Sequence, residues 1–281
     1  MAIHSNFHTH SCFSDGKETP EAFAIRATEL GFHHLGFTEH APVPFENKWS
    51  MGFDQMDEYV RVIDSLKVQY GDTMTIYRGL EADYIPDVSY PFDFLRERLS
   101  LDYIIGSVHL VSKAGCGMWF IDGPDKGEYF EGLEEVFGGD VEEAVTAYYE
   151  QQIEMIRKEK FEILGHCDKV KMHNKGKLFR SDEPWIRALQ KALLNEVRKA
   201  GLIVEVNTRG IYKGRCDEVY PSPAMIAECV KENIPLMLNS DAHLPEEIDG
   251  HFGETILLLR ELKVKELMVF EGNGFRPVSI V

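Results

Sequence analysis

Several features are missing from this sequence of 281 residues, and each absence disfavours a class of protein. There is no run of eighteen apolar residues, and the first ten residues, MAIHSNFHTH, lack the basic and apolar regions of a secretory signal. The five cysteines form no C-x-x-C pair, and an odd number is more typical of reduced core residues than of a disulfide framework. We therefore expect a cytoplasmic protein without a membrane span.

Basic residues are also fewer than acidic ones. The chain has 30 Lys and Arg against 47 Asp and Glu, which gives a formal net charge of -17 at pH 7. Such a chain repels polyanions on average, so broad binding to nucleic acid or to an anionic membrane is disfavoured. Acidic side chains gathered around bound cations would nevertheless make one pocket attractive to anions.

No linker or repeat divides the chain. Stretches rich in Pro, Ser or Gly do not separate two halves of different composition, and no internal repeat recurs. Barrels of βα units reach roughly 250 residues as one folding unit. We therefore expect residues 1–281 to form a single domain.

Short apolar strands alternate with amphipathic helices along the whole chain. This alternation is typical of βα units arranged around a parallel sheet. Start and stop signals predict four of the helices: one from Thr19 and Pro20 to Gly31, one after Asp140 with Glu143, one after Ser181 ending at Gly201, and one after Ser222 and Pro223.

The strand-like segments end in polar residues. In chain order they close with NFHTH, LGFTEH, YRGLEADY, IIGSVH, ILGHCD, IVEVNTR and LMLNSDAH. The carboxyl ends of all strands in a closed parallel barrel emerge on one face, so these distant residues should converge there. Cys167 directly follows His166, and we expect it to point the other way and pack in the core.

His8 and His10 are the first candidates for a metal site. Alternation along a strand places residues two apart on the same face, so both imidazoles can bind one cation. Asp241 and His243 repeat this spacing, and five more candidates follow other strands: Asp15, His40, Glu81, His109 and His166. Buried together without cations, the carboxylates would repel one another. Imidazole and carboxylate without thiolate suit zinc, manganese or iron.

These motifs resemble the PHP (polymerase and histidinol phosphatase) superfamily, and within it the histidinol phosphatases of the PHP type. The motifs HTHSCFSDG, FTEH, GLEAD, GSVH, GHCD, EVNT followed by YPSP, and NSDAH occur in family order over nearly the full length. The resemblance implies an α/β fold, a distorted (β/α)7 TIM-like barrel, with an active site that holds two or three divalent metal ions.

The resemblance also implies how the ligands are shared. One metal ion would be held by His8, His10, Glu81 and Asp241, a second by Glu81, His109 and His166, and a third by Asp15, His40 and His243. Among them, Glu81, Asp241 and His243 are the expected catalytic residues.

Three residues are candidates for contacts to phosphate or substrate. The family commonly has an arginine after the GH-x-D motif, whereas GHCDKVKMHN offers Lys171, which keeps the charge but loses the bidentate fork. Arg209, directly after EVNT, is the best replacement candidate. For both residues a solvated surface position is the alternative. His33, which precedes the second strand, is a further candidate, with packing as its alternative.

The long segment from Ser112 to Gly139 has no evident structure in its sequence. Loops of this length are usually functional or disordered. Its position beside the expected metal face suggests a lid or a side wall of the site, and a folded decoration with its own small core is the alternative.

The favoured function is a metal-dependent phosphomonoesterase acting on a small phosphorylated metabolite. The resemblance implies L-histidinol phosphate as that substrate, in histidine biosynthesis. The alternatives are a phosphatase for another small ester, an exonuclease or phosphodiesterase, and a metal-binding scaffold. A nuclease needs a basic, aromatic-lined groove, which the net charge disfavours, and structural metal sites usually close their coordination with protein groups. The oligomeric state stays open.

Overall fold

A computed structural model describes residues 3–123 and 126–281, and its centre is a sheet of seven parallel strands. These strands are the seven segments that the sequence predicts. In sheet order they are β1 (Ser5–Asn6), β2 (His34–Phe37), β3 (Thr75–Asp83), β4 (Tyr103–Ser107), β7 (Ile163–Leu164), β8 (Ile203–Asn207) and β9 (Leu236–Asn239).

The sheet curls until its last strand meets its first. Just beyond β9, the amide of His10 donates to the carbonyl of Ala242 at 2.8 Å, and the amide of Ala242 donates to the carbonyl of His8 at 3.2 Å. Only a single parallel bridge, Thr9 to Ala242, joins these segments. The prediction of a distorted (β/α)7 barrel is therefore confirmed, with closure restricted to the carboxyl end of the strands.

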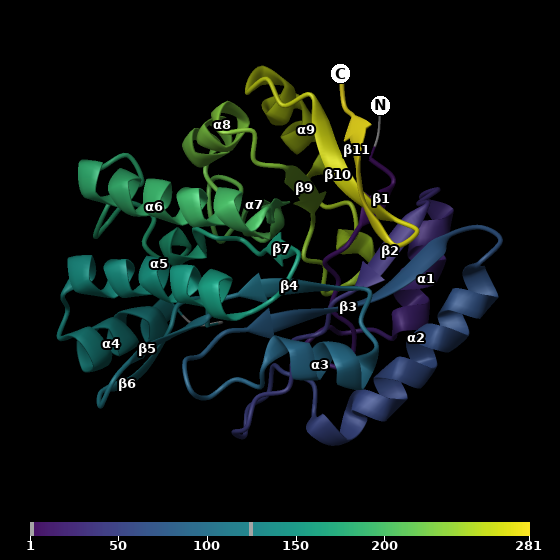
Figure 1. The fold of residues 1–281 in the computed structure, drawn as a ribbon, viewed down its shortest axis with the longest axis horizontal. Coiled ribbons are helices and arrows are strands. Elements are labelled where there is room, and N and C mark those ends of the chain that lie inside the picture. Colours follow the sequence, from purple (N-terminus) through teal and green to yellow (C-terminus); the bar gives the residue numbers. More distant parts are fainter. Residues whose placement is uncertain (1–2, 124–125) are drawn as a thin grey trace.

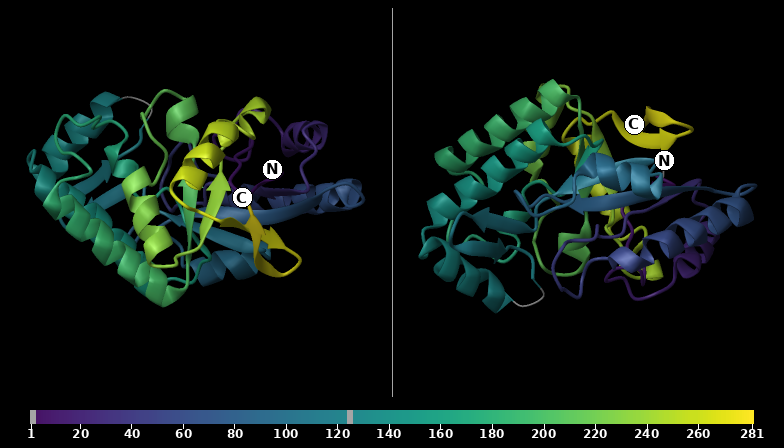
Figure 2. Two further views of the ribbon diagram at one scale, coloured as in Figure 1. Left: turned by 90° about the horizontal axis from the view of Figure 1, so that it is seen from above. Right: turned by 60° about the horizontal axis from the view of Figure 1, so that its bottom comes forward.

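Helices cover the outside of this barrel (Figures 1 and 2). The α-helices outside the 112–139 segment are α1 (Pro20–Glu29), α2 (Met56–Tyr70), α3 (Phe92–Leu99), α5 (Val141–Lys158), α6 (Pro184–Ala200), α7 (Arg209–Tyr212), α8 (Pro223–Lys231) and α9 (Phe252–Glu261). Short 3₁₀ turns lie at η1 (Phe53–Gln55), η2 (Lys169–Lys171) and η3 (Pro245–Glu247). Within the described residues, no helix has both the length and the apolar character needed to cross a membrane.

Three of the four predicted helix starts are confirmed by their caps. The side chains of Thr19, Asp140 and Ser222 each accept a hydrogen bond from a backbone amide in the first turn of α1, α5 and α8. The third start is wrong: α6 begins at Pro184, three residues after Ser181, because the proline ring presets the first helical φ angle there. This helix ends at Gly201 as predicted, with φ 69°.

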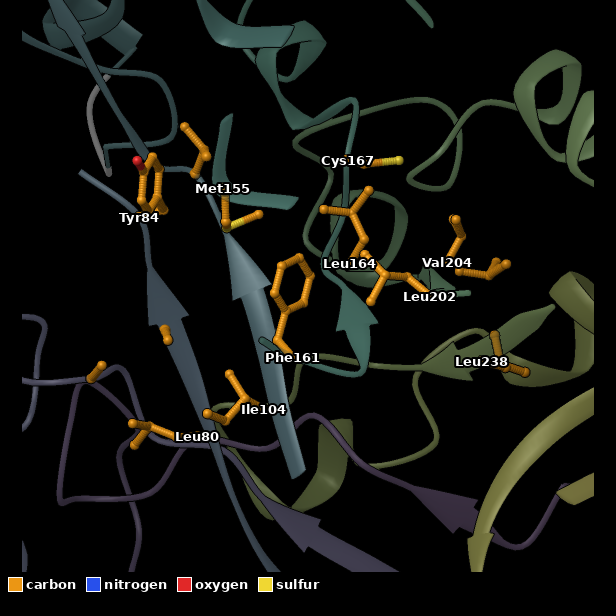
Figure 3. Close-up of a cluster of buried hydrophobic side chains, with 14 of the residues drawn as sticks. Leu80, Tyr84, Ile104, Met155, Phe161, Leu164, Cys167, Leu202, Val204 and Leu238 are labelled. Carbon is orange, nitrogen blue, oxygen red and sulfur yellow. The ribbon is translucent and has the colours of Figure 1, made fainter. Parts of the chain in front are cut away.

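The main hydrophobic core lies between the strands and the outer helices. Figure 3 shows Leu80, Ile104, Leu164 and Leu238 from the strands among side chains of the surrounding segments. Cys167 is fully buried in this core, as predicted, and all five cysteines are free.

A second apolar cluster fills the amino end of the barrel interior. Tyr77, Tyr103, Ile163 and Ile203 lie at or near the beginnings of their strands and point inward. The hairpin of β10 (Glu266–Glu271) and β11 (Gly274–Ser279) packs against this end through Val269 and Phe270. Its Phe270 ring lies 4.8 Å from the ring of Tyr77, centroid to centroid. We call the buried residues of this group the amino-end cluster; they are Phe7, Tyr77, Tyr103, Ile105, Ile163, Ile203, Met237, Val269 and Phe270.

The segment from Ser112 to Gly139 is folded. It contains the end of β5 (Leu110–Lys113), β6 (Gly117–Phe120) and α4 (Lys126–Phe137), and residues 124–125 lie outside the described part. The fully buried Trp119 packs against Tyr129 and Phe137, with ring centroids 4.8 and 5.9 Å away. The segment is thus a folded decoration with its own small core, which was one of the two alternatives for it.

Candidate metal centre

A cavity of about 640 Å³ opens at the carboxyl end of the barrel strands. Its wall includes Phe120 and Asp122, so the 112–139 segment forms part of one side. The cavity lining also carries six basic side chains: Lys17, Lys48, Lys169, Arg209, Lys213 and Arg215. Five acidic side chains share this lining, so basic and acidic groups nearly balance there in a chain whose formal net charge is -17.

Glu81, on β3, lies at the centre of the predicted ligands. Its side chain is 1% exposed, and its two carboxylate oxygens face five imidazoles. Oε2 lies 3.2 Å from His8 Nε2, 3.4 Å from His10 Nε2 and 3.1 Å from His40 Nδ1, and Oε1 lies 2.8 Å from His166 Nε2 and 3.6 Å from His109 Nε2. The Glu81 carboxylate can therefore belong to two groups of ligands, with His8, His10 and His40 at Oε2 and with His109 and His166 at Oε1.

Two aspartates join the remaining ligands to this set. Asp241 Oδ1 lies 3.4 Å from His10 Nε2 and 3.5 Å from His243 Nδ1. Asp15 Oδ1 lies 3.0 Å from His243 Nε2 and 3.7 Å from His40 Nε2. The structure thus brings all nine predicted ligands into one cluster.

The side chains fall into overlapping groups, each compact enough to surround one cation. These groups are His10, Asp15, His40 and His243; His8, His10 and Glu81; His8, His166 and Asp241; and His40, Glu81 and His109. The first contains the expected set Asp15, His40 and His243 together with His10, and the second contains three of the four residues expected to share one ion. The last pairs His109 and Glu81 with His40 where His166 was expected.

Unpaired ring nitrogens indicate what the cluster can hold. Both nitrogens of His10, His8 Nε2 and His40 Nδ1 are buried and lack a hydrogen-bond partner among the described residues. Buried polar atoms without partners are rare in proteins. A donor set of imidazole and carboxylate suits divalent transition-metal ions, so the residues present fit metal ions as their missing partners.

The charge states of His10 and Glu81 suit cations, whereas neighbouring carboxylates outweigh burial and raise the pKa of His8 and, to about 9, that of His109. Burial lowers the pKa of His10 well below its ordinary value, and the nearby His40 and His243 lower it further. Burial alone would raise the pKa of Glu81, but His8, His40 and His109 outweigh it and hold that pKa well below its ordinary range. A neutral imidazole and an ionised carboxylate are the forms that coordinate metals.

Glu205, on β8, is a site residue that the sequence reasoning missed. Its buried carboxylate accepts from His8 Nδ1 at 2.6 Å and from the amide of His166 at 2.9 Å. The side-chain amides of Asn207 and Asn239 donate to it at 3.1 and 3.0 Å. The bond to Nδ1 directs Nε2 of His8 toward the cluster. The signal was present in EVNT, because alternation along β8 turns Glu205 inward together with Asn207.

Glu39, beside His40, is a second residue that was missed. Its buried carboxylate accepts from the amide of Ser11 at 3.0 Å and from the hydroxyls of Ser11 and Ser14. Burial raises the pKa of Glu39 to about 7, although these hydrogen bonds oppose the rise. The carboxyl group thereby anchors the loop that carries Asp15.

The structure corrects the prediction for Lys171. Its ammonium group is buried against Asp168 at 2.7 Å, Glu218 at 2.8 Å and the carbonyl of Val219 at 3.0 Å, and it does not line the metal cavity. Lys169 does line it. The two side chains diverge because they are two residues apart in the η2 turn, where about three residues complete one turn.

Lys169 lies at the cavity, where the sequence had led us to expect Lys171. Its Nζ lies 2.7 Å from Asp122 Oδ2 and 3.4 Å from His109 Nε2. Asp122 comes from the 112–139 segment, and no sequence motif connects it with Lys169. Sequence reasoning therefore had no signal for this pair.

The two remaining candidates have opposite outcomes. Arg209 lines the cavity, and its guanidinium donates to the carbonyl of Asp241 at 2.8 Å. His33 is exposed at the amino end of β2, where its amide donates to the carbonyl of His4. Because His33 precedes β2 while His40 follows it, His33 lies at the opposite end of the barrel, and the prediction of a substrate contact is wrong.

The fold and the cluster together define a metal-binding α/β barrel with its site at the carboxyl ends of the strands. The family model for the PHP domain matches residues 4–209, and the chain belongs to this family. The predicted resemblance is thus confirmed over nearly three quarters of the sequence.

Known proteins similar to this chain carry related names. A Deinococcus radiodurans protein named "Probable histidinol-phosphatase" is 29% identical over 260 residues, covering 92% of each chain. The structure of HisK from Listeria monocytogenes is 24% identical with a TM-score of 0.78, covering 89% of this chain and 99% of that one. Histidinol phosphate phosphatase from Lactococcus lactis, solved with zinc, L-histidinol and phosphate, is 20% identical with a TM-score of 0.67, covering 97% and 98%.

Proposed function

We propose that this protein is a metal-dependent phosphomonoesterase that converts L-histidinol phosphate into L-histidinol and phosphate. The observation that carries the proposal is the cluster of nine candidate ligand side chains beside a cavity whose lining includes six basic side chains. The choice of substrate is supported by the name of the Deinococcus relative and by the ligands bound to the Lactococcus structure. The protein would then act in histidine biosynthesis, in the cytoplasm.

Two or three divalent ions would be held by His8, His10, Asp15, His40, Glu81, His109, His166, Asp241 and His243. Zinc is supported by the Lactococcus structure, and manganese and iron suit the same donors. When bound, such ions lower the pKa of a coordinated water toward about 7 and neutralise charge on a phosphoryl group.

The protein's own cations would bind the phosphate. Lys169 and Arg209 line the cavity and are each less than 10% exposed, so their charges act where little water screens them. Asp122 holds the ammonium group of Lys169, and the Asp241 carbonyl holds the guanidinium of Arg209. Because these partners fix both cations before substrate arrives, little reorganisation is needed on binding.

The competing functions each lack a supporting feature. A nuclease needs an extended basic groove that follows a polynucleotide, whereas the basic residues here surround one cavity in a chain of net charge -17. A structural metal site usually closes its coordination with protein groups, whereas this cluster borders an open cavity. Hydrolysis of another small phosphate ester remains the nearest alternative.

A phosphate-release screen tests the proposal. Protein loaded with zinc, manganese or iron is assayed on a panel of phosphorylated metabolites that includes L-histidinol phosphate, alongside chelated protein and labelled single-stranded DNA. We expect the highest kcat/KM for L-histidinol phosphate and loss of turnover after chelation. Rapid hydrolysis of another ester with none of L-histidinol phosphate would refute the substrate, and degradation of the DNA alone would refute the phosphomonoesterase.

A further inference from the structure

Two aromatic rings extend the cavity wall away from the ligand cluster. The ring of Trp49, in the loop after β2, lies edge-on to the ring of His40 with centroids 5.5 Å apart. The ring of Phe120, at the end of β6, has its centroid 6.5 Å from the centroid of the Trp49 ring, and the two ring planes are tilted by 34°. Both rings are partly buried and line the cavity. The rings of His40, Trp49 and Phe120 therefore follow one another along the cavity wall.

One carboxylate of the cavity lies apart from the cluster and its supporting ion pairs. Asp15 and Asp241 belong to the cluster, while Asp122 and Glu247 are paired with Lys169 and Lys213. Glu128, in the first turn of α4, is the remaining acidic residue of the lining, and its side chain is exposed.

The carboxylate of Glu128 lies beside the outer aromatic ring. A Cβ atom built on Gly123 would collide with Glu128 Oε2 and would lie 3.2 Å from Cδ1 of Phe120. Glycine at this position therefore leaves room for both side chains to line the cavity. The outer part of the wall thus combines aromatic faces with a negative charge.

We propose that Trp49, Phe120 and Glu128 form the subsite for the alcohol part of the substrate, and that this subsite selects an alcohol that carries a planar ring and a positive charge. The inference rests on the proposed function and extends it to the leaving group. With the phosphate at the cluster, the short chain of the substrate runs along Trp49. Its heteroaromatic ring packs against Trp49 and Phe120, and the carboxylate of Glu128 attracts the ammonium group on the short chain. Aromatic faces attract both planar rings and cations.

The test compares two esters that share the phosphate and differ in the alcohol. L-Histidinol phosphate carries a ring and an amine, whereas glycerol phosphate carries neither. The measured quantity is the ratio of kcat/KM for the first ester to that for the second, in the metal-loaded enzyme. We expect the ratio to fall about three- to tenfold in Trp49→Leu and in Phe120→Leu, and about two- to fivefold in Glu128→Gln.

Matched controls separate this role from general damage. Glu135→Gln changes an exposed glutamate two turns further along α4, and Phe53→Leu changes an exposed aromatic ring outside the cavity. Neither should alter the ratio. Competitive inhibition by L-histidinol gives a second readout, and we expect it to weaken in the three subsite variants.

The outcomes distinguish the inference from the function on which it rests. If the unmodified enzyme ignores L-histidinol phosphate, the proposed function is wrong. If the enzyme hydrolyses it well and the three variants keep the ratio and the inhibition by L-histidinol, the function stands and the subsite is wrong. An equal loss for both esters in Trp49→Leu would show that Trp49 only supports His40, which would also overturn its assignment.

Discussion

The two ends of the barrel interior have opposite chemistry. At the amino end, Tyr77, Tyr103, Val269 and Phe270 belong to the buried amino-end cluster, which is apolar or aromatic throughout. At the carboxyl end, nine imidazoles and carboxylates form overlapping groups, and the ligand atoms of each group lie within 4.8 Å of one another. Strand β3 supplies both ends, because Tyr77 and Glu81 are four residues apart and point to the same side.

This contrast divides stability and function between the two ends. Burying aromatic side chains stabilises a fold, whereas bringing charged groups together in a dry site costs free energy unless they are paired. The hairpin β10–β11 completes the apolar end and leaves the polar end open to substrate. We infer that the amino end supports the strands which hold the ligands in place.

Substitution of the shared carboxylate should have the largest effect. Glu81→Gln removes the charge that faces five imidazoles, and we expect kcat to fall by about 10³- to 10⁴-fold. Steady-state phosphate release with metal in excess measures this loss. The unfolding midpoint of the chelated variant should stay close to that of the chelated parent. A variant with near-normal turnover would contradict the central position of Glu81.

At the opposite end, Phe270→Ala should affect stability without affecting chemistry. Loss of this ring opens a cavity in the amino-end cluster, and we expect the free energy of unfolding to fall by about 3–5 kcal/mol. Denaturant unfolding followed by circular dichroism measures it. The folded variant should bind the same amount of metal as the parent. Selective loss of metal at unchanged stability would show that the two ends are not separate.

Glu205→Gln should weaken metal binding by about 10- to 100-fold, because the charged carboxylate that accepts from Nδ1 of His8 is replaced by a neutral amide, which orients the imidazole less firmly. Competition against a chelator of known affinity measures this change directly, without an activity assay. Glu162, which is paired with Arg96 on the surface, offers a matched control in Glu162→Gln. Equal metal affinity in the two variants would rule out a role for Glu205 in orienting His8.

The smallest of these effects concerns the two lysines of η2. We expect Lys169→Met to raise KM for the phosphate ester by about tenfold, because a charged hydrogen-bond donor to phosphate is lost. Lys171→Met should mainly lower stability, since it leaves Asp168 buried without its cation. Kinetics at a temperature where both variants are folded separate the two. A larger rise in KM for Lys171→Met would reverse the assignment.

Much of the ligand cluster could be predicted because the candidate ligands other than Asp15, which lies in the loop after β1, are at or just after a strand end. Apolar runs identify the strands, and parallel strands in a closed barrel expose their carboxyl ends on one face. His8, Glu81 and Asp241 converge for this reason although they are far apart along the chain. The same rule explains why His33, at a strand start, had to be wrong.

Residues outside the strands could not be placed in this way. Whether Lys169 or Lys171 faces the cavity depends on the direction of a short 3₁₀ turn that their common charge does not reveal. Asp122 and Phe120 reach the cavity only because the 112–139 segment folds around Trp119 and packs beside the barrel.

Local sequence pattern was thus sufficient for the seven strands of the main sheet, for four of the helices and for the nine candidate ligands, since alternation along a strand and the direction of the chain are local properties. Packing between distant segments was needed to place Glu205 against His8, Lys169 against Asp122, and Trp49 beside Phe120. Each of these contacts joins side chains whose separation depends on how whole elements dock, and no short stretch of the chain contains that information.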